Sequence, residues 1–132
     1  MRGLLDTSVV VGLSRLEEDQ LPAEPVISAV TLAELTVGPL VCADPLERAR
    51  RQAVLQQAEA DFEPLPFDGA CARAFGQVAA SLRSSDGNRS YDALIAATAL
   101  ANGLPLYTAN PSDVEGIDGL DVRVVRLPGG EA

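Results

Sequence analysis

The chain has 132 residues, a formal net charge of −9 and a sequence pI near 4.3. This length predicts one domain, and a hydrophobic content of 47% is enough to form a buried core. Neither histidine nor lysine occurs in the chain, which excludes sites built on a histidine base and phosphate-binding or Schiff-base sites that require a lysine.

Short apolar runs alternate with capped or amphipathic segments along the whole chain. Five of these runs are expected to be strands: residues 3–5, 26–29, 62–66, 104–107 and 120–127. The segments between them are expected to be helices: residues 6–16, 30–37, 44–62, 68–84 and 91–100, with Asp44 and Asp68 as N-caps of the third and fourth. Asn110 and Pro111 are expected to open a further helix as N-cap and first helical residue. Strands that alternate with helices predict an α/β fold with a parallel sheet, in one domain over residues 1–127 with a loose tail at 128–132.

Three of the expected elements have features that predict their environment. The segment 62–66 contains two prolines, which restrict it to the edge of a sheet. Residues 91–100 are apolar on nearly every face, as in a helix enclosed by other elements. The arginines of the helix 44–62 are expected to form a solvated face balanced by Glu47 and Glu59. The same helix has only a thin apolar stripe, made of Leu46, Ala49, Ala53, Val54 and Gln57.

The sequence also predicts where the protein resides. The apolar opening of the chain ends at Asp6, too early for a signal peptide or a membrane span, and we expect a cytoplasmic protein. Cys42 and Cys71 lack the spacing of metal ligands. In a cytoplasmic chain they are most simply reduced packing residues.

Four acidic residues stand at or near expected helix starts, and each has an ordinary structural explanation. Asp6 has the position of an N-cap, and Glu34 has capping-box spacing from Thr31. Asp92 and Asp113 are first-turn charges, which the helix dipole favours. In a parallel sheet, however, helix N-termini and strand C-termini lie at the same edge, where ligands bind. Four converging carboxylates would repel one another unless a divalent cation neutralised them, so the joint placement predicts an oxygen-only site for Mg²⁺ or Mn²⁺.

Four segments of the chain resemble the ordered motifs of the PIN-domain family. They are Leu4-Leu5-Asp6-Thr7-Ser8, Thr31-Leu32-Ala33-Glu34-Leu35, residues 92–99 and residues 103–113. The resemblance covers essentially the whole chain and is greatest to the toxin ribonucleases of VapBC toxin–antitoxin systems. It implies a five-stranded parallel sheet, Mg²⁺- or Mn²⁺-dependent cleavage of structured RNA such as tRNA or rRNA, a homodimer, and inhibition by a cognate VapB-type antitoxin.

The same resemblance assigns roles to individual residues. It places the family's catalytic and metal-binding acids on four positions, Asp6, Glu34, Asp92 and Asp113. Further polar residues match the family's motifs around these acids: Thr7, Ser8, Thr108 and Asn110. Arg89 is suggested as a substrate contact. Val114 stands where such toxins often carry Phe, at a packing position.

The chemistry expected of such a site is hydrolysis of a phosphodiester bond. Metal ions held by the carboxylates would bind the scissile phosphate, activate a water molecule and stabilise the leaving oxygen. Asp6 is the first choice as the central ligand. The alternative is a PIN-fold module that binds RNA or protein without catalysis. Such modules usually lack one or more of the acids, whereas all four are present here.

The acidity of the chain bears on its partners. A net charge of −9 argues against broad electrostatic binding of nucleic acid and implies that RNA is contacted by a few arginines. The remaining negative charge suits a basic antitoxin segment. We expect this segment to fill a groove along the helices 44–62 and 6–16, the second of which is expected to expose Val9, Val10 and Leu13.

Overall fold

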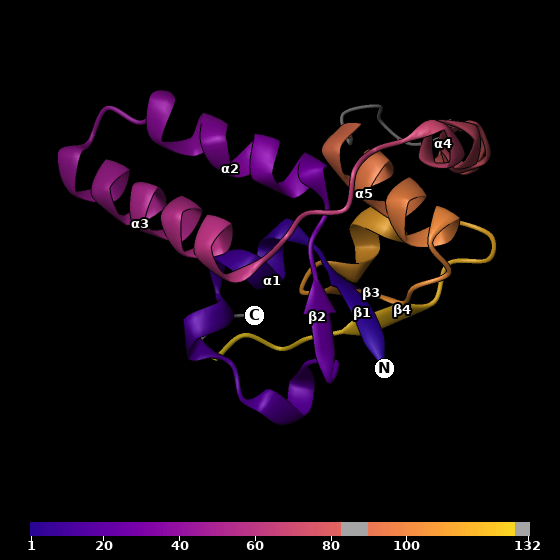
Figure 1. The fold of residues 1–132 in the computed structure, drawn as a ribbon, viewed down its shortest axis with the longest axis horizontal. Helices are drawn as coiled ribbons and strands as arrows, with labels where there is room; N and C mark the ends of the chain where they lie inside the picture. The colour runs from indigo at the N-terminus through magenta and orange to yellow at the C-terminus, as the bar shows by residue number, and fades with distance from the viewer. Residues whose placement is uncertain (83–89, 129–132) are drawn as a thin grey trace.

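Four parallel strands form the centre of the molecule, in the spatial order β2-β1-β3-β4 (Figure 1). The computed structural model describes residues 1–82 and 90–128. The strands are β1 (Arg2–Leu5), β2 (Glu24–Val26), β3 (Leu106–Thr108) and β4 (Val122–Val124). The expected parallel sheet is therefore confirmed, with four strands in place of the predicted five.

In the described residues, five α-helices and three short 3₁₀ helices connect the strands. The α-helices are α1 (Thr7–Val11), α2 (Ala29–Leu40), α3 (Pro45–Asp61), α4 (Gly69–Leu82) and α5 (Ser90–Ala101). The 3₁₀ helices are η1 (Leu13–Arg15), η2 (Glu18–Gln20) and η3 (Pro111–Val114). In the described part of the chain, no helix is long and apolar enough to cross a membrane.

The predicted strand at 62–66 is only an isolated bridge beside the end of β2. Leu65 accepts a hydrogen bond from the N–H of Ala29 and donates one to the carbonyl of Ile27, at 2.8 and 2.9 Å. Its two neighbours are Pro64 and Pro66, which have no N–H to donate, so pairing cannot extend in either direction. The expected edge location is correct, but the length of the strand is not.

The core lies on both faces of the sheet because successive strand residues point to opposite sides. Leu4 and Leu106 pack with α5 and α4 on one face. Leu5 and Tyr107 pack with α1 and α3 on the other face. The enclosed character predicted for 91–100 is confirmed, since residues 95–99 are all buried. This arrangement fixes the carboxyl ends of β1 and β3 side by side, with helices above and below them.

The first helix is shorter than predicted and turns a different face to solvent. It ends at Gly12, and η1 follows in place of a continuous helix to Leu16. Gly12 is buried, and a Cβ atom there would come within 2.6 Å of Leu127, which explains the glycine at this break. Val9 and Val10 are buried against the sheet, so the expectation that they are exposed is wrong. Val11 is the exposed valine of α1, at 53%.

Helices α2 and α3 form a hairpin that projects from the sheet (Figure 1). The N-cap of α2 is Ser28, which accepts a hydrogen bond from the N–H of Thr31, so the predicted capping box of Thr31 and Glu34 is not formed. The helix continues through Gly38-Pro39 to Leu40, beyond its predicted end. The cap of α3 by Asp44 is as predicted.

The buried face of α3 differs from the predicted stripe. Leu55 and Ala58 are its buried residues, whereas Leu46 is 63% exposed at the far end of the hairpin. Of the proposed arginine balance, Glu47 pairs with Arg50 and Arg51 at 3.0 and 3.2 Å. The predicted tail has only Pro128 within the described residues, and 129–132 lie outside them.

Candidate active site

Asp6 directly follows β1 and is held by hydrogen bonds on one carboxylate oxygen. Its Oδ2 accepts from the Ser8 hydroxyl at 2.6 Å and from the Thr108 hydroxyl at 3.0 Å. The Ser8 N–H is 3.4 Å from the same oxygen, so Asp6 is also the predicted N-cap of α1. The side chain is 7% exposed. A buried carboxylate fixed by two hydroxyl donors is oriented rather than free to rotate.

The loop after β3 is joined to the loop after β1 through the same hydroxyl groups. The Ser8 hydroxyl oxygen accepts from the Ala109 N–H at 3.1 Å. The Thr108 hydroxyl oxygen accepts from the Asn110 N–H at 3.0 Å. These bonds lock the two strand ends together, so the residues after β3 are placed relative to Asp6.

Glu34 lies in α2 and faces Asp6 from the neighbouring element. The Thr7 hydroxyl donates to Glu34 Oε1 at 2.8 Å, and it lies 3.0 Å from the hydroxyl of Thr31, which is fully buried. Burial raises the pKa of Glu34, the hydrogen bond from Thr7 opposes this rise, and the negative charge of Asp6 adds to it. The influence of Asp6 on the pKa of Glu34 indicates that the two carboxylates are close enough to repel each other.

All four predicted acids line one open cavity at the carboxyl edge of the sheet. Its volume is about 470 Å³. Its lining includes Asp6, Glu34, Asp92 and Asp113 together with Thr7, Ser8, Val11 and Asn110. Asp92 reaches it from the first turn of α5, and Asp113 from η3. Residues from four separate stretches of sequence thus meet at one place.

Two of the predicted site residues, Thr108 and Arg89, are not among the residues that line the cavity. Thr108 is buried behind Asp6, is 2% exposed and holds this carboxylate. Arg89 lies outside the described residues.

Two contributors to the site were missed by sequence reasoning. Thr31 supports Thr7, and the backbone N–H of Ala109 anchors Ser8. The sequence signal for Thr31 is Ser28, a better N-cap candidate three residues earlier, which frees the Thr31 side chain for another role. No residue type marks the contribution of Ala109, because it is made by the backbone alone.

The donor set fits a hard divalent cation in its chemistry. Four carboxylates and the side-chain amide of Asn110 line the cavity, and oxygen ligands are those that Mg²⁺ and Mn²⁺ prefer. Within residues 1–82 and 90–128, however, no three histidine, cysteine or acidic side chains form a ready-made ion site. Sharing a cavity is a weaker condition than enclosing one ion, and carboxylates without a cation repel one another. An ion would have to draw these side chains together.

Comparison with known proteins identifies the family to which the chain belongs. A family model described as "PIN domain" matches residues 3–112. Ribonuclease VapC5 of Mycobacterium tuberculosis is 37% identical over 130 residues, which cover 95% of each chain. Ribonuclease VapC4 of the same organism is 38% identical over 111 residues, which cover 81% of this chain and 85% of the relative.

Solved structures agree with these relatives. The crystal structure of VapBC-5 from Mycobacterium tuberculosis matches with a TM-score of 0.79 at 38% identity, over 95% of this chain and 98% of that chain. DNA-bound VapBC from Salmonella typhimurium matches with a TM-score of 0.72 at 27% identity, over 92% and 96%. The chain therefore belongs to the PIN-domain family, in the branch that contains these VapC proteins.

Proposed function

We propose that this protein is a Mg²⁺- or Mn²⁺-dependent endoribonuclease, the toxin of a VapBC-type toxin–antitoxin system. The observation that carries the proposal is the single cavity lined by Asp6, Glu34, Asp92 and Asp113. Without histidine or lysine, the chain offers carboxylates, hydroxyls, amides and arginines for chemistry at a phosphate. The names of the relatives, which are ribonucleases, support the same reaction class.

The carboxylates of the cavity and the hydroxyl groups that hold two of them have different parts in this proposal. The four carboxylates would hold the cation, which when bound lowers the pKa of a water molecule and polarises the scissile phosphate. Ser8 and Thr108 keep Asp6 in one orientation through its Oδ2 atom. Thr7 does the same for Glu34, whose ionised form the hydrogen bond favours. Two of the four proposed ligands, Asp6 and Glu34, are thereby held in place before an ion binds, which lowers the cost of binding it.

The proposed substrate is structured RNA, of the tRNA or rRNA class, in the cytoplasm. A chain with a net charge of −9 gains little from general attraction to a polyanion, so shape and a few cationic contacts would have to select the RNA.

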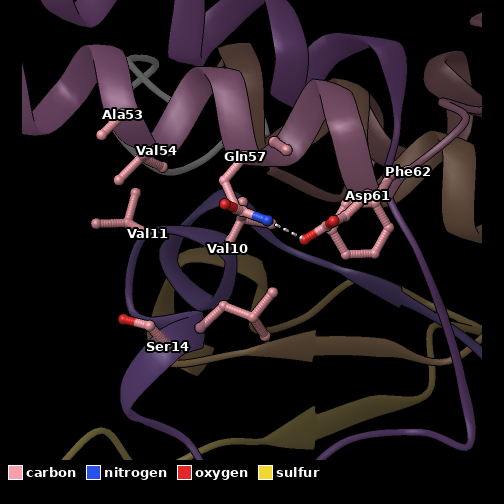
Figure 2. Close-up of a pocket in the computed structure, with 10 residues that line it drawn as sticks. Val10, Val11, Ser14, Ala53, Val54, Gln57, Asp61 and Phe62 are labelled. Carbon is pink, nitrogen blue, oxygen red and sulfur yellow. Dashed lines mark hydrogen bonds between the residues drawn. The ribbon is translucent and has the colours of Figure 1, made fainter.

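We further propose that an antitoxin segment binds in an apolar groove between α1 and α3. Figure 2 shows Val10, Val11 and Ser14 on one side of this groove and Ala53, Val54 and Gln57 on the other. The groove has a volume of about 440 Å³. Val11 also lines the acidic cavity, so one extended segment could follow the groove and bring a basic side chain to the acids. Amphipathic segments commonly bind such grooves, and several structural neighbours are toxin–antitoxin complexes.

We also propose that the protein is a homodimer. The support is apolar exposure near the far end of the α2–α3 hairpin, where Leu40, Val41 and Leu46 are each more than 60% exposed. Apolar patches of this kind commonly mark surfaces that another chain covers. Sedimentation velocity measures the state directly, and a monomer at micromolar concentration would contradict this proposal.

Cleavage of RNA with and without a cation tests the proposed reaction. End-labelled tRNA and rRNA fragments are incubated with purified protein in Mg²⁺, in Mn²⁺ and in EDTA. We expect internal cuts with either cation and none in EDTA. Asp92→Asn should lose cleavage while its thermal unfolding resembles that of the wild type. Binding of RNA without any cutting would favour the non-catalytic module, and cutting that persists in EDTA would contradict the metal mechanism.

A further inference from the structure

Two arginines of α3 line a hollow that adjoins the acidic cavity. The hollow has a volume of about 450 Å³ and lies among α1, α2 and α3. It shares Thr7, Val11 and Glu34 with the acidic cavity, and its lining adds Arg50 and Arg51. A chain that extends out of the acidic cavity past Glu34 would therefore meet these two guanidinium groups.

The two arginines are held in place by a shared carboxylate. Arg51 donates through Nε to Glu47 at 3.2 Å and through Nη1 to the Gly38 carbonyl at 3.0 Å. Arg50 donates through Nη1 to the other oxygen of Glu47, at 3.0 Å. These hydrogen bonds lower the pKa of Glu47, which keeps it ionised as an anchor. Arg50, Arg51 and Glu47 together carry a net charge of +1, and the other carboxylate of the hollow, Glu34, stands at its border with the acidic cavity. The Arg50 side chain is 65% exposed.

Three other arginines of the described residues lie away from this hollow. Arg48, on the same helix, donates twice to the Cys42 carbonyl at the hairpin end. Arg123 pairs with Asp121 beside β4. Arg2 begins β1 and so stands at the end of the sheet opposite to the acids. The positive charge next to the cavity is thus local, on a chain whose net charge is strongly negative.

A phosphate is the ligand that suits this position. A nucleic-acid strand carries one phosphate per nucleotide, so a strand with its scissile phosphate at the acids has further phosphates just beyond them. Guanidinium groups bind phosphate oxygens with directed, charge-assisted hydrogen bonds. An acidic peptide could bind the same two arginines, but nothing requires it to lie across the four carboxylates as well. An RNA strand that is cut at the carboxylates must lie across them.

We propose that Arg50 and Arg51 bind a phosphate of the RNA strand that neighbours the one to be cut. Arg50 makes the main contact through its exposed N–H groups. Arg51 has a positioning role, because its bonds to Glu47 and Gly38 hold the pair against α2. This inference rests on the proposed ribonuclease function and adds to it a binding site for the substrate.

A binding measurement separates this site from catalysis. The Asp6→Asn background is used so that the RNA stays intact, and the probe is a fluorescein-labelled tRNA, which belongs to the class of the proposed substrate. Fluorescence anisotropy gives the affinity of the background protein and of Arg50→Gln and Arg50→Lys at several salt concentrations. Arg73→Gln in α4 is the matched control, because it removes the same charge from another exposed helical site.

We expect Arg50→Gln to weaken RNA binding about tenfold at low salt, the loss of one charge-assisted contact. The negative slope of log affinity against log salt should become shallower by about 0.7–0.9, the value for one phosphate contact on single-stranded or duplex nucleic acid. Arg50→Lys should recover most of the affinity, and Arg73→Gln should change neither quantity. Equal losses for Arg50→Gln and Arg73→Gln would reduce the effect to overall charge and overturn the proposal.

The possible outcomes separate a failure of this inference from a failure of the proposed function. If the wild-type chain cuts RNA while Arg50→Gln binds it as well as the background does, the phosphate site is wrong and the ribonuclease stands. If the wild-type chain neither binds nor cuts RNA, both proposals fail. A loss confined to antitoxin binding would assign the arginines to the protein partner and would also overturn the phosphate site.

Discussion

The hydroxyl of Thr108 donates a hydrogen bond of 3.0 Å to the carboxylate of Asp6, although 102 residues separate the two in sequence. Thr108 ends β3, and Asp6 follows β1, its neighbour in the sheet. The parallel pairing of β1 and β3 therefore fixes the orientation of the Asp6 carboxylate. The Thr108 hydroxyl oxygen also accepts a hydrogen bond from the Asn110 N–H, so Thr108 connects the loop after β3 to Asp6 at the end of β1.

Thr108→Val tests this relationship, since valine has nearly the same shape but no hydroxyl. The change leaves a buried carboxylate oxygen with one donor fewer and removes the acceptor of the Asn110 N–H. We expect a loss of about 1–3 kcal/mol in the free energy of unfolding and a fall in kcat larger than the change in KM. Urea unfolding and steady-state cleavage measure the two effects. Thr108→Ser, which keeps the hydroxyl, should restore both, and full kcat in the valine variant would leave Thr108 a structural role only.

Asp6→Asn separates the capping role of Asp6 from its proposed catalytic role. Asparagine caps helices about as well as aspartate, so the cap itself should be retained. The variant should be at least as stable as the wild type, because one of several repelling carboxylates is gone, and it should lose RNA cleavage. Asp68→Asn is the matched control, since Asp68 caps α4 through the Cys71 N–H at 3.1 Å. Asp68→Asn should cleave normally. Equal cleavage by both variants would remove Asp6 from the site.

Sequence reasoning located Asp6, Asp92 and Asp113 because each caps a helix or lies in its first turn, and the chain order of such elements is readable from composition. Glu34 lies in the second turn of α2, and its place in the site was implied by the family resemblance. The burial pattern of α5 and the caps by Asp6, Asp44 and Asp68 were predicted for the same reason, since these are local signals. The convergence of Asp6, Glu34, Asp92 and Asp113 on one cavity also follows from local placement, once the sheet is parallel.

What local signals could not give is which side chains meet across elements. The run from Val26 to Val30 is apolar except for Ser28, so it was assigned to one strand as far as Ala29, whereas β2 ends at Val26 and Ser28 caps α2. The pair Thr7 and Thr31 depends on the packing of α1 against α2, and the exposure of Val11 in place of Val9 depends on where α1 breaks. Tertiary packing decides these contacts, and it leaves no periodic pattern in the sequence.

Glu34→Gln tests the raised pKa of Glu34 in metal-free protein. Burial raises this pKa above its ordinary value of 4.5, so the folded protein binds the proton more tightly than the unfolded chain does. The favourable contribution of Glu34 is therefore complete below about pH 4.5 and is lost as the pH rises through the folded-state pKa. Glutamine does not ionise and escapes this loss.

We expect Glu34→Gln in EDTA to be more stable than the wild type at pH 7, by less than about 1 kcal/mol, because Glu34 is partly exposed and solvent screens its charge. The difference should shrink as the pH falls toward the ordinary range of a glutamate. Urea unfolding at a series of pH values measures it, and RNA cleavage by the variant should be lost. A stability difference that does not vary with pH would show that ionisation of Glu34 is not its cause.

Val11→Gln tests the proposed antitoxin groove, because Val11 lines both this groove and the two hollows beside it. Val11 lines the groove of Figure 2, the hollow with Arg50 and Arg51, and the acidic cavity. At 53% exposure it contributes little to the core, so the fold should persist, while a partner segment would lose an apolar contact worth about 1–2 kcal/mol. We expect the Kd for the antitoxin encoded by the adjacent reading frame to rise about tenfold. Val124→Gln is the matched control, because Val124 is also a valine at 53% exposure but lies on β4. Titration calorimetry gives both constants, and an equal change in the two variants, or none in either, would place the partner elsewhere on the molecule.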